Sequence, residues 1–365
     1  MQLPASEDLE INHLTSVFED VTTSYKYYWF LAILNHLKNN QQSEIHISEL
    51  IYEMIADVWY AVNYFNLSFG SQDKLSEKIG DLMGIHKLRG SIKKGELLTW
   101  MKVNREDKTL QGVVSDLSRY VPYRFLSPWF SNELRGVPDQ HRNKHILINA
   151  EKRFETHQPI MYKYKEYSIE INPRWKAYML KHLGILTGFT KYKLLQYLQK
   201  HNSNVPGITE KLTPPNERNL HAAKKFWRIY SELKGELHCI YTNEQLNPKI
   251  ISIDHFIPWS FVAHDQIWNL VPVNRTLNSS KGNRLPAEKY INDLSSLHFD
   301  AFQTVREIKS QKKILEDYVV LFKKDLKTIA DYPENEFLDR LKNNFQPAIQ
   351  IASSMGFQEN WSWGK

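Results

Sequence analysis

The chain has 365 residues, of which 42% are hydrophobic and 24% are charged, with a formal net charge of +6 at pH 7. This length fits two or three domains, and this composition excludes a chain that is disordered throughout. The single cysteine, Cys239, excludes an internal disulfide framework and a zinc site built on several thiolates, so we expect no structural zinc.

The first third of the chain has the periodicity of amphipathic helices. Apolar residues recur at i, i+3, i+4 and i+7 in residues 27–34 and 51–62. Because the aromatic residues at 25–30 follow this spacing, we interpret them as core residues rather than as a surface for stacking bases. The most apolar stretch, 50–69, carries acidic side chains, so it does not predict a membrane span, and we expect a cytoplasmic protein.

The middle of the chain predicts a strand, a helix and a linker. Residues 167–171 alternate apolar and polar side chains, which is typical of a half-buried strand. Asn172 and Pro173 have the character of an N-cap and a first-turn proline, and Gly184 has that of a glycine that ends a helix. Residues 203–219 contain three prolines and a glycine and predict a linker between domains.

The segment beyond the linker predicts short strands among helices. Pro272 fits the first turn of a helix and Gly282 its end. A long apolar stripe over 315–329 indicates a further helix. The predicted elements are a helix over 220–233, strands over 238–241 and 250–254, a helix over 272–281, and helices again over the last ~75 residues.

These elements predict an α+β fold that is mainly α-helical. The predicted domains are a mainly helical accessory domain over 1–205, the linker over 206–219, a small mixed domain over 220–290 and a helical region over 291–365.

Basic residues cluster in three segments, 86–105, 140–166 and 218–234. Such runs are usually solvated faces, but a surface that follows a nucleic-acid backbone has the same composition. Charge alone is compatible with a polyanionic partner without requiring one.

Four polar residues stand out in the segment that follows the linker. Asp254 and His255 end an apolar strand, Asn269 follows His255 by 14 residues, and Asn278 follows Asn269 by nine. A hairpin followed by a helix would bring Asp254 and Asn278 together. Their oxygen atoms, with waters and phosphate oxygens, are the ligands that Mg²⁺ prefers, and an imidazole beside that ion is a candidate base for water.

Each of these residues also has an ordinary structural interpretation. An isolated Asp-His pair is usually a turn with a surface histidine, Asn269 fits a turn, and Asn278 fits a hydrogen bond within its own helix. Only the joint pattern favours a catalytic site over these alternatives.

The joint pattern resembles the HNH nuclease family, which has the ββα-metal fold. The resemblance rests on residues 253–258 (Ile-Asp-His-Phe-Ile-Pro), on Asn269 with the leucine after it, and on residues 278–283 (Asn-Ser-Ser-Lys-Gly-Asn). The spacings are also similar to those of the HNH domain in RNA-guided CRISPR effector nucleases. The resemblance covers residues 239–286 and implies a small nuclease domain embedded between helical regions.

The resemblance implies a role for each matching residue. Asp254 and Asn278 would hold one Mg²⁺ or Mn²⁺ ion, and His255 would be the general base. Asn269 matches the asparagine that helps to orient the histidine. Lys281 shares a helix face with Asn278, and is either a ligand for phosphate or developing charge, or a helix-end lysine favoured by the dipole.

The implied activity is metal-dependent hydrolysis of double-stranded DNA with 5′-phosphate and 3′-hydroxyl products. A restriction or phage-defence role is a hypothesis by association. Two alternatives remain: a catalytically idle DNA-binding module, and a signal-regulated helical scaffold protein with latent nuclease activity. The helical regions are candidates for contact with a protein partner or with a second copy of the chain, and no membrane contact is expected.

Overall fold

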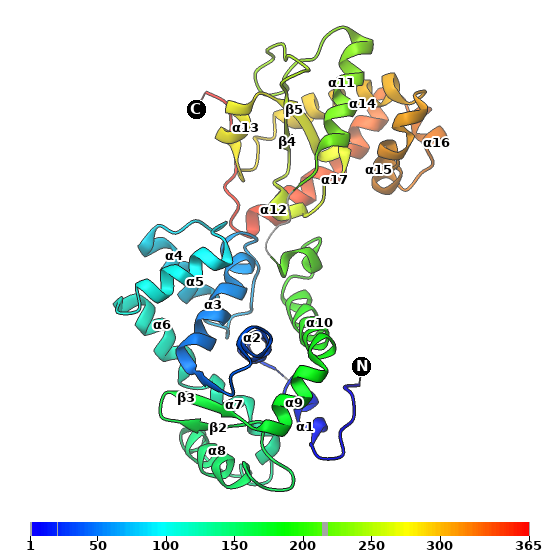
Figure 1. Cartoon of the computed structure of the whole chain (residues 1–365). Coiled ribbons are helices and arrows are strands. Elements are labelled where there is room, and N and C mark those ends of the chain that lie inside the picture. The colour runs from blue at the N-terminus through cyan, green and yellow to red at the C-terminus, as the bar shows by residue number, and fades with distance from the viewer. Residues whose placement is uncertain (1, 20, 214–217, 365) are drawn as a thin grey trace. The chain divides into compact units, whose positions relative to one another are not determined.

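The computed structural model describes residues 2–19, 21–213 and 218–364. It divides into two compact units, Met1–Ser203 with Lys211–Pro214, and Asn204–Glu210 with Pro215–Lys365. We call these unit 1 and unit 2, and Figure 1 shows their elements. The fold is α+β and mainly α-helical, which confirms the predicted fold class. Among the described residues, no helix combines the length and the apolarity that a bilayer crossing requires.

Unit 1 combines helices with a small antiparallel sheet of strand order β1-β3-β2. The strands are β1 (Glu44–His46), β2 (Tyr162–Lys165) and β3 (Ser168–Ile171). The described α-helices are α1 (Ile11–Ser16), α2 (Tyr25–Asn40), α3 (Ile47–Asn63), α4 (Leu75–His86), α5 (Lys94–Val103), α6 (Lys108–Ser118), α7 (Val121–Phe125), α8 (Asp139–Arg153), α9 (Pro173–Lys181) and α10 (Leu183–His201).

Helix α2 lies in the core of unit 1, where it packs against α3 and α10. Its aromatic residues after the half-buried Tyr25 are buried, and Trp29 and Phe30 have no exposed surface. The indole of Trp29 donates a hydrogen bond of 3.1 Å to the hydroxyl of Tyr162 on β2. The interpretation of this aromatic run as core is therefore confirmed.

The start of α9 follows the sequence signals and its end does not. Asn172 caps the helix by accepting a hydrogen bond of 2.9 Å from the amide of Arg174, and Pro173 is the first helical residue. Gly184 was predicted to end the helix, but it lies inside α10, which begins at Leu183. That prediction was wrong, because the C-cap of α9 is His182, whose φ of −111° lies outside the left-handed region that favours glycine.

Unit 2 contains a two-stranded antiparallel sheet, β4-β5, among helices. Helix α11 packs on both strands and α13 packs on β4 (Figure 1). The elements are α11 (His221–Lys234), β4 (Ser252–His255), α12 (Trp259–Val262), the 3₁₀ helix η3 (Ile267–Asn269), β5 (Leu270–Val273), α13 (Arg275–Lys281), α14 (Tyr290–Val305), α15 (Lys312–Phe322), α16 (Leu326–Ala330) and α17 (Glu334–Ser354).

A single hydrophobic core joins the two halves of unit 2. The cluster of buried apolar residues runs from Ala223 on α11 to Trp361, beyond α17. Residues 220–290 and 291–365 therefore share one core, in which α14 packs against α11 and α17. The predicted linker contains the short 3₁₀ helix Ile208–Lys211, and its residues 214–217 lie outside the described part of the chain.

The partner strand of β4 differs from the predicted one. Residues 238–241 form only one isolated bridge, from His238 to Gln245, and β4 pairs instead with β5. Pro272 was expected in the first turn of a helix, but it lies inside β5. A proline, which has no N–H, is tolerated there because both strands of a two-stranded sheet are edge strands.

The apolar stripe over 315–329 does not form one helix. It is divided between α15 and α16 by Lys323, whose φ of +53° ends α15 in the left-handed region. Most of the last ~75 residues lie in helices α14 to α17, as predicted, and the chain beyond Ser354 is not helical where the structure describes it.

Candidate active site

The candidate site is built by the β4–β5 hairpin and the helix that follows it. In the register of the hairpin, Asp254 lies opposite Val271 and His255 lies opposite Leu270. The chain then enters α13, whose N-cap Asn274 accepts a hydrogen bond of 2.7 Å from the amide of Leu277. The order strand, strand, helix places the end of β4 against α13 (Figure 1).

Asp254 lies at this contact and is only 3% exposed. Its carboxylate accepts a hydrogen bond of 2.8 Å from the hydroxyl of Tyr241 and one of 3.1 Å from the ammonium group of Lys281. Burial, together with the neighbouring Asp254, raises the pKa of Tyr241 well above its ordinary value, so this hydroxyl remains a donor. The sequence did not identify Tyr241, because nothing local marks a tyrosine 13 residues before the aspartate as its partner.

Lys281 is buried with its charged end inside the site. Its ammonium group donates a second hydrogen bond, of 2.7 Å, to the backbone carbonyl of His255. Burial lowers the pKa of Lys281, and the charge of Asp254 opposes this effect. The lysine therefore ties α13 to the end of β4, and a contact with a phosphate would require it to leave this pair.

His255 is 5% exposed and is paired with a carboxylate that the sequence analysis did not select. Its Nε2 lies 2.7 Å from Oδ1 of Asp265, in the loop between α12 and η3. Asp265 follows a histidine in a polar stretch, so its local sequence gives no sign of this pairing. The amide of Ile267, at the start of η3, in turn donates a hydrogen bond of 2.7 Å to Asp317 on α15.

Asn269 is fully buried and acts on the backbone just after His255. Its amide group donates a hydrogen bond of 2.9 Å to the carbonyl of Ile257 and accepts one of 2.8 Å from the Ile257 amide. The carbonyl of Asn269 also accepts a hydrogen bond of 2.8 Å from the amide of Phe256. Asn269 thus fixes the path of the chain that leaves the histidine, rather than touching the imidazole.

Asn278 reaches from α13 back to β4. Its amide nitrogen donates to the hydroxyl of Ser252 at 2.8 Å and to the carbonyl of Ile253 at 3.3 Å. Both hydrogen bonds use the nitrogen, so the carbonyl oxygen is the side-chain atom that remains for a ligand. This contact brings the Asn278 side chain to the residue that precedes Asp254.

The donor atoms on β4 and α13 are of the kinds that bind a hard divalent cation. Asp254 offers a carboxylate, Asn278 a carbonyl oxygen and Ser252 a neighbouring hydroxyl, and Mg²⁺ is commonly held by one or two carboxylates with waters and substrate phosphates. Each carboxylate oxygen has acceptor capacity beyond the single hydrogen bond that it accepts here. The described residues contain no cluster of three or more His, Cys, Asp or Glu side chains that would form a complete metal cage.

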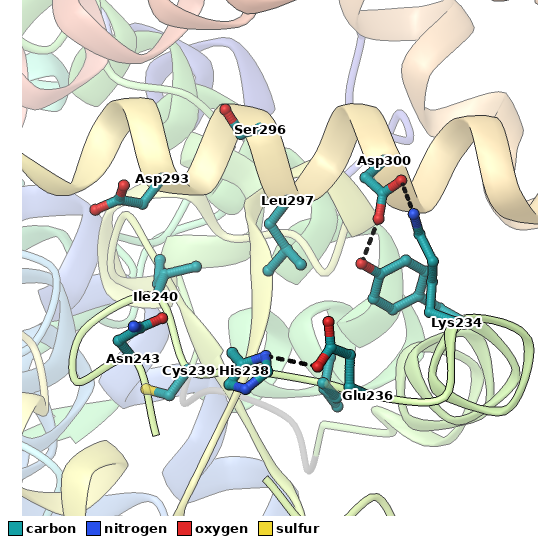
Figure 2. A pocket seen from close by; sticks show the side chains of 12 residues that line it. Lys234, Glu236, His238, Cys239, Ile240, Asn243, Asp293, Ser296, Leu297 and Asp300 are labelled. Atoms are coloured by element: carbon teal, nitrogen blue, oxygen red, sulfur yellow. Dashed lines mark hydrogen bonds and ion pairs between the residues drawn. The ribbon is translucent and has the colours of Figure 1, made fainter. Parts of the chain in front are cut away.

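A separate cavity of about 540 Å³ lies between α14 and residues 236–243 (Figure 2). Acidic side chains line it from both sides, among them Glu236 and Asp293. A third acid, Asp300, is neutralised by Lys234 at 2.6 Å. The acidic lining of this cavity disfavours the phosphates of a nucleic acid. None of the five predicted site residues is among the described residues that line the cavity.

Residues 239–287 match the family model described as HNH endonuclease. This segment, which contains the β4–β5 hairpin and α13, is an HNH-family domain, as the sequence pattern predicted. Such a domain supports nuclease activity on DNA. No curated protein and no solved structure matches the chain.

Proposed function

We propose that the chain is a divalent-metal-dependent endonuclease that hydrolyses DNA phosphodiester bonds and leaves 5′-phosphate and 3′-hydroxyl ends. The observation that carries the proposal is the docking of α13 on β4 inside the HNH-family domain. Asn278 of α13 hydrogen-bonds to the backbone of β4 immediately before Asp254 and His255, the last two residues of that strand. A carboxylate, an imidazole and an amide oxygen are the groups that metal-assisted hydrolysis requires.

His255 is the proposed general base. Because Asp265 accepts a hydrogen bond from Nε2, the proton of the neutral imidazole resides on that nitrogen, and Nδ1 carries the lone pair. A water molecule at Nδ1 would lose its proton to the imidazole as it attacks phosphorus. Asn269 supports this step by fixing the backbone that leaves His255.

Asp254 and Asn278 are the proposed metal ligands. A Mg²⁺ or Mn²⁺ ion bound to them would neutralise charge on the scissile phosphate and on the leaving 3′-oxygen. Lys281 orients the Asp254 carboxylate and anchors the His255 carbonyl, so it acts on both groups at once. Its charge next to the carboxylate also means that a bound cation shares Asp254 with an ammonium group.

Unit 1 is the proposed recognition part of the protein. It is a compact body of its own, with basic segments over 86–105 and 140–166, and it lies outside the residues that match the HNH family. A nuclease that distinguishes foreign from self DNA needs such a part, so we extend the proposal to a restriction or phage-defence effector. Double-stranded DNA is the proposed partner.

A plasmid assay tests the proposed activity. Purified protein is incubated with supercoiled plasmid, methylated or unmethylated, in Mg²⁺, in Mn²⁺ or in chelator. We expect nicked or linear products with either metal, none with chelator, and resealing of the nicks by DNA ligase, which requires 5′-phosphate and 3′-hydroxyl ends. Absence of cleavage in both metals on every substrate would refute constitutive activity of the purified chain, and dependence on methylation would support the defence role.

A latent nuclease is the second candidate, and one observation favours it. Asp254 is nearly buried, and its carboxylate accepts hydrogen bonds from Tyr241 and Lys281, so a signal that exposes this carboxylate would favour metal binding. A chain that cuts plasmid only after addition of a protein partner or a second nucleic acid would support this candidate, whereas cleavage by the purified chain alone would exclude it.

A further inference from the structure

The C-terminal helices contribute a carboxylate close to the candidate site. Asp317 lies on α15, thirty residues beyond the end of the segment that matches the HNH family at residue 287. Its Oδ2 accepts a hydrogen bond of 2.7 Å from the backbone amide of Ile267, and α15 packs along η3. No contact of this kind is expected from the ββα motif itself.

The hydrogen bond from Ile267 serves a group that has no partner within its own helix. Ile267 is the first residue of η3, and the first amides of a helix have no intrahelical acceptor. Asp317 therefore caps η3 from a different element. Burial raises the pKa of Asp317, and the hydrogen bond from Ile267 opposes this rise. The hydrogen bond therefore offsets part of the hydration that the carboxylate loses at this position.

The capped segment carries the partner of the histidine. Asp265 lies two residues before Ile267 and binds Nε2 of His255 at 2.7 Å. The loop turns into this segment through Ala263, whose φ of +55° is uncommon for a residue with a side chain. A loop with such a turn needs external contacts to stay in one conformation, and Asp317 provides one at its far end.

We propose that Asp317 and Asp265 are positioning residues of the nuclease: Asp317 holds the 263–267 loop so that Asp265 keeps the His255 imidazole in one tautomer and orientation. This inference rests on the proposed function, because it assigns His255 the role of base. It makes α15 a working part of the nuclease rather than a neighbouring domain. Neither aspartate touches the substrate, and both act through the histidine.

Three substitutions test the proposal on the full chain. Asp317→Ala removes the acceptor, Asp317→Asn keeps a carbonyl oxygen for the Ile267 amide, and Glu316→Ala removes the neighbouring exposed carboxylate as a matched control. The measurements are the single-turnover cleavage rate at saturating DNA, the DNA affinity, the thermal unfolding midpoint, and hydrogen exchange of the peptide that contains residues 263–269.

We expect Asp317→Ala to lower the cleavage rate by about ten-fold or more, since small misplacements of a catalytic group carry costs of this order. DNA affinity should stay at the wild-type value, exchange over 263–269 should rise, and Asp317→Asn should restore most of the rate. Asp265→Ala should lower the rate at least as much, with the same unchanged affinity.

The proposal is overturned if Asp317→Ala and Glu316→Ala cleave at the same rate, or if the loss in Asp317→Ala is one of DNA affinity alone. It is also overturned if Asp317→Asn fails to restore the rate while its unfolding midpoint is that of the wild type. Failure of the proposed function has a different signature, namely absence of cleavage by the wild-type chain. If the wild-type chain does not cleave DNA, hydrogen exchange still tests the structural part of the proposal. Equal exchange over residues 263–269 in Asp317→Ala and in the wild type would show that Asp317 does not hold the loop.

Discussion

Asp254 and Lys281 form a buried ion pair at the candidate site. A buried ion pair gains little net stability, because each charge is first removed from water, but loss of one partner leaves the other uncompensated. Tyr241 and the His255 carbonyl supply further hydrogen bonds to the two charges. The pair therefore specifies how α13 docks on β4.

Replacement of Lys281 tests this interpretation. Lys281→Met should lower the free energy of unfolding by about 3 kcal/mol, since it leaves the Asp254 carboxylate buried without its cation. The exposed Lys312→Met serves as the control and should change stability by less than about 0.5 kcal/mol. Urea unfolding of both variants provides the comparison.

The double variant sharpens the test. Adding Asp254→Asn to Lys281→Met removes the unpaired charge and should recover part of the lost stability, because the effects of two contacting residues are not additive. Losses that simply add would show that the pair contributes nothing as a pair.

Among the elements, three helices meet around one buried histidine. His298 on α14 has no exposed surface, binds the hydroxyl of Tyr318 on α15 at 2.7 Å and packs edge-on against Trp227 on α11. Burial lowers its pKa from 6.5 to about 3. The native state thus keeps this imidazole neutral at pH values at which the unfolded chain protonates it.

This difference predicts a pH dependence of stability. Between pH 6.5 and about 3 the unfolded chain binds a proton at His298 that the native state does not bind. The contribution of the neutral His298 to the free energy of unfolding is therefore complete above pH 6.5 and is lost as the pH falls. At pH 5 the loss amounts to roughly 2 kcal/mol relative to pH 7. His298→Gln should lose correspondingly less between these pH values in urea unfolding, whereas the exposed His221→Gln should follow the wild type; equal slopes for all three would contradict the assignment.

The sequence predicted the elements whose signals are local. Asn172 supplies the capping side chain of α9 and Pro173 is its first residue. Gly282 ends α13 as expected. The strand pairing was missed because Pro272 has the same sequence signature in an edge strand and in a first helical turn.

The site itself divides in the same way. The order Asp254, His255, Asn278 indicated the motif, and in the structure Asn278 hydrogen-bonds to β4 at the residue that precedes Asp254 and His255. Tyr241, Asp265 and Asp317 were not identified, because each acts through a contact between elements that no local pattern encodes.

For the molecule as a whole, DNA binding by unit 2 should depend on its exposed cations. Helix α11 buries Phe226 and Trp227 and exposes Lys224, Lys225 and Arg228 on the other face. Phosphates bound by such a row release counterions, so affinity falls steeply with salt.

Alanine at positions 224, 225 and 228 should weaken binding to duplexes of any sequence. The slope of log affinity against log salt should fall by about one for each lost phosphate contact. Alanine at the exposed lysines 323, 324 and 327 removes the same charge and serves as the control. Fluorescence anisotropy at several salt concentrations measures both, and an equal effect would show that net charge rather than α11 sets the affinity.

Cleavage by the His255→Ala variant tests the central claim most directly. Its plasmid-nicking rate in Mg²⁺ is compared with that of the wild type, with DNA affinity measured in parallel and His238→Ala as the control imidazole. The account predicts a loss of at least about 100-fold for His255→Ala, since a general base typically contributes 10²–10⁴-fold, with unchanged affinity and a near wild-type rate for His238→Ala. Nicking by His255→Ala at the wild-type rate would contradict it.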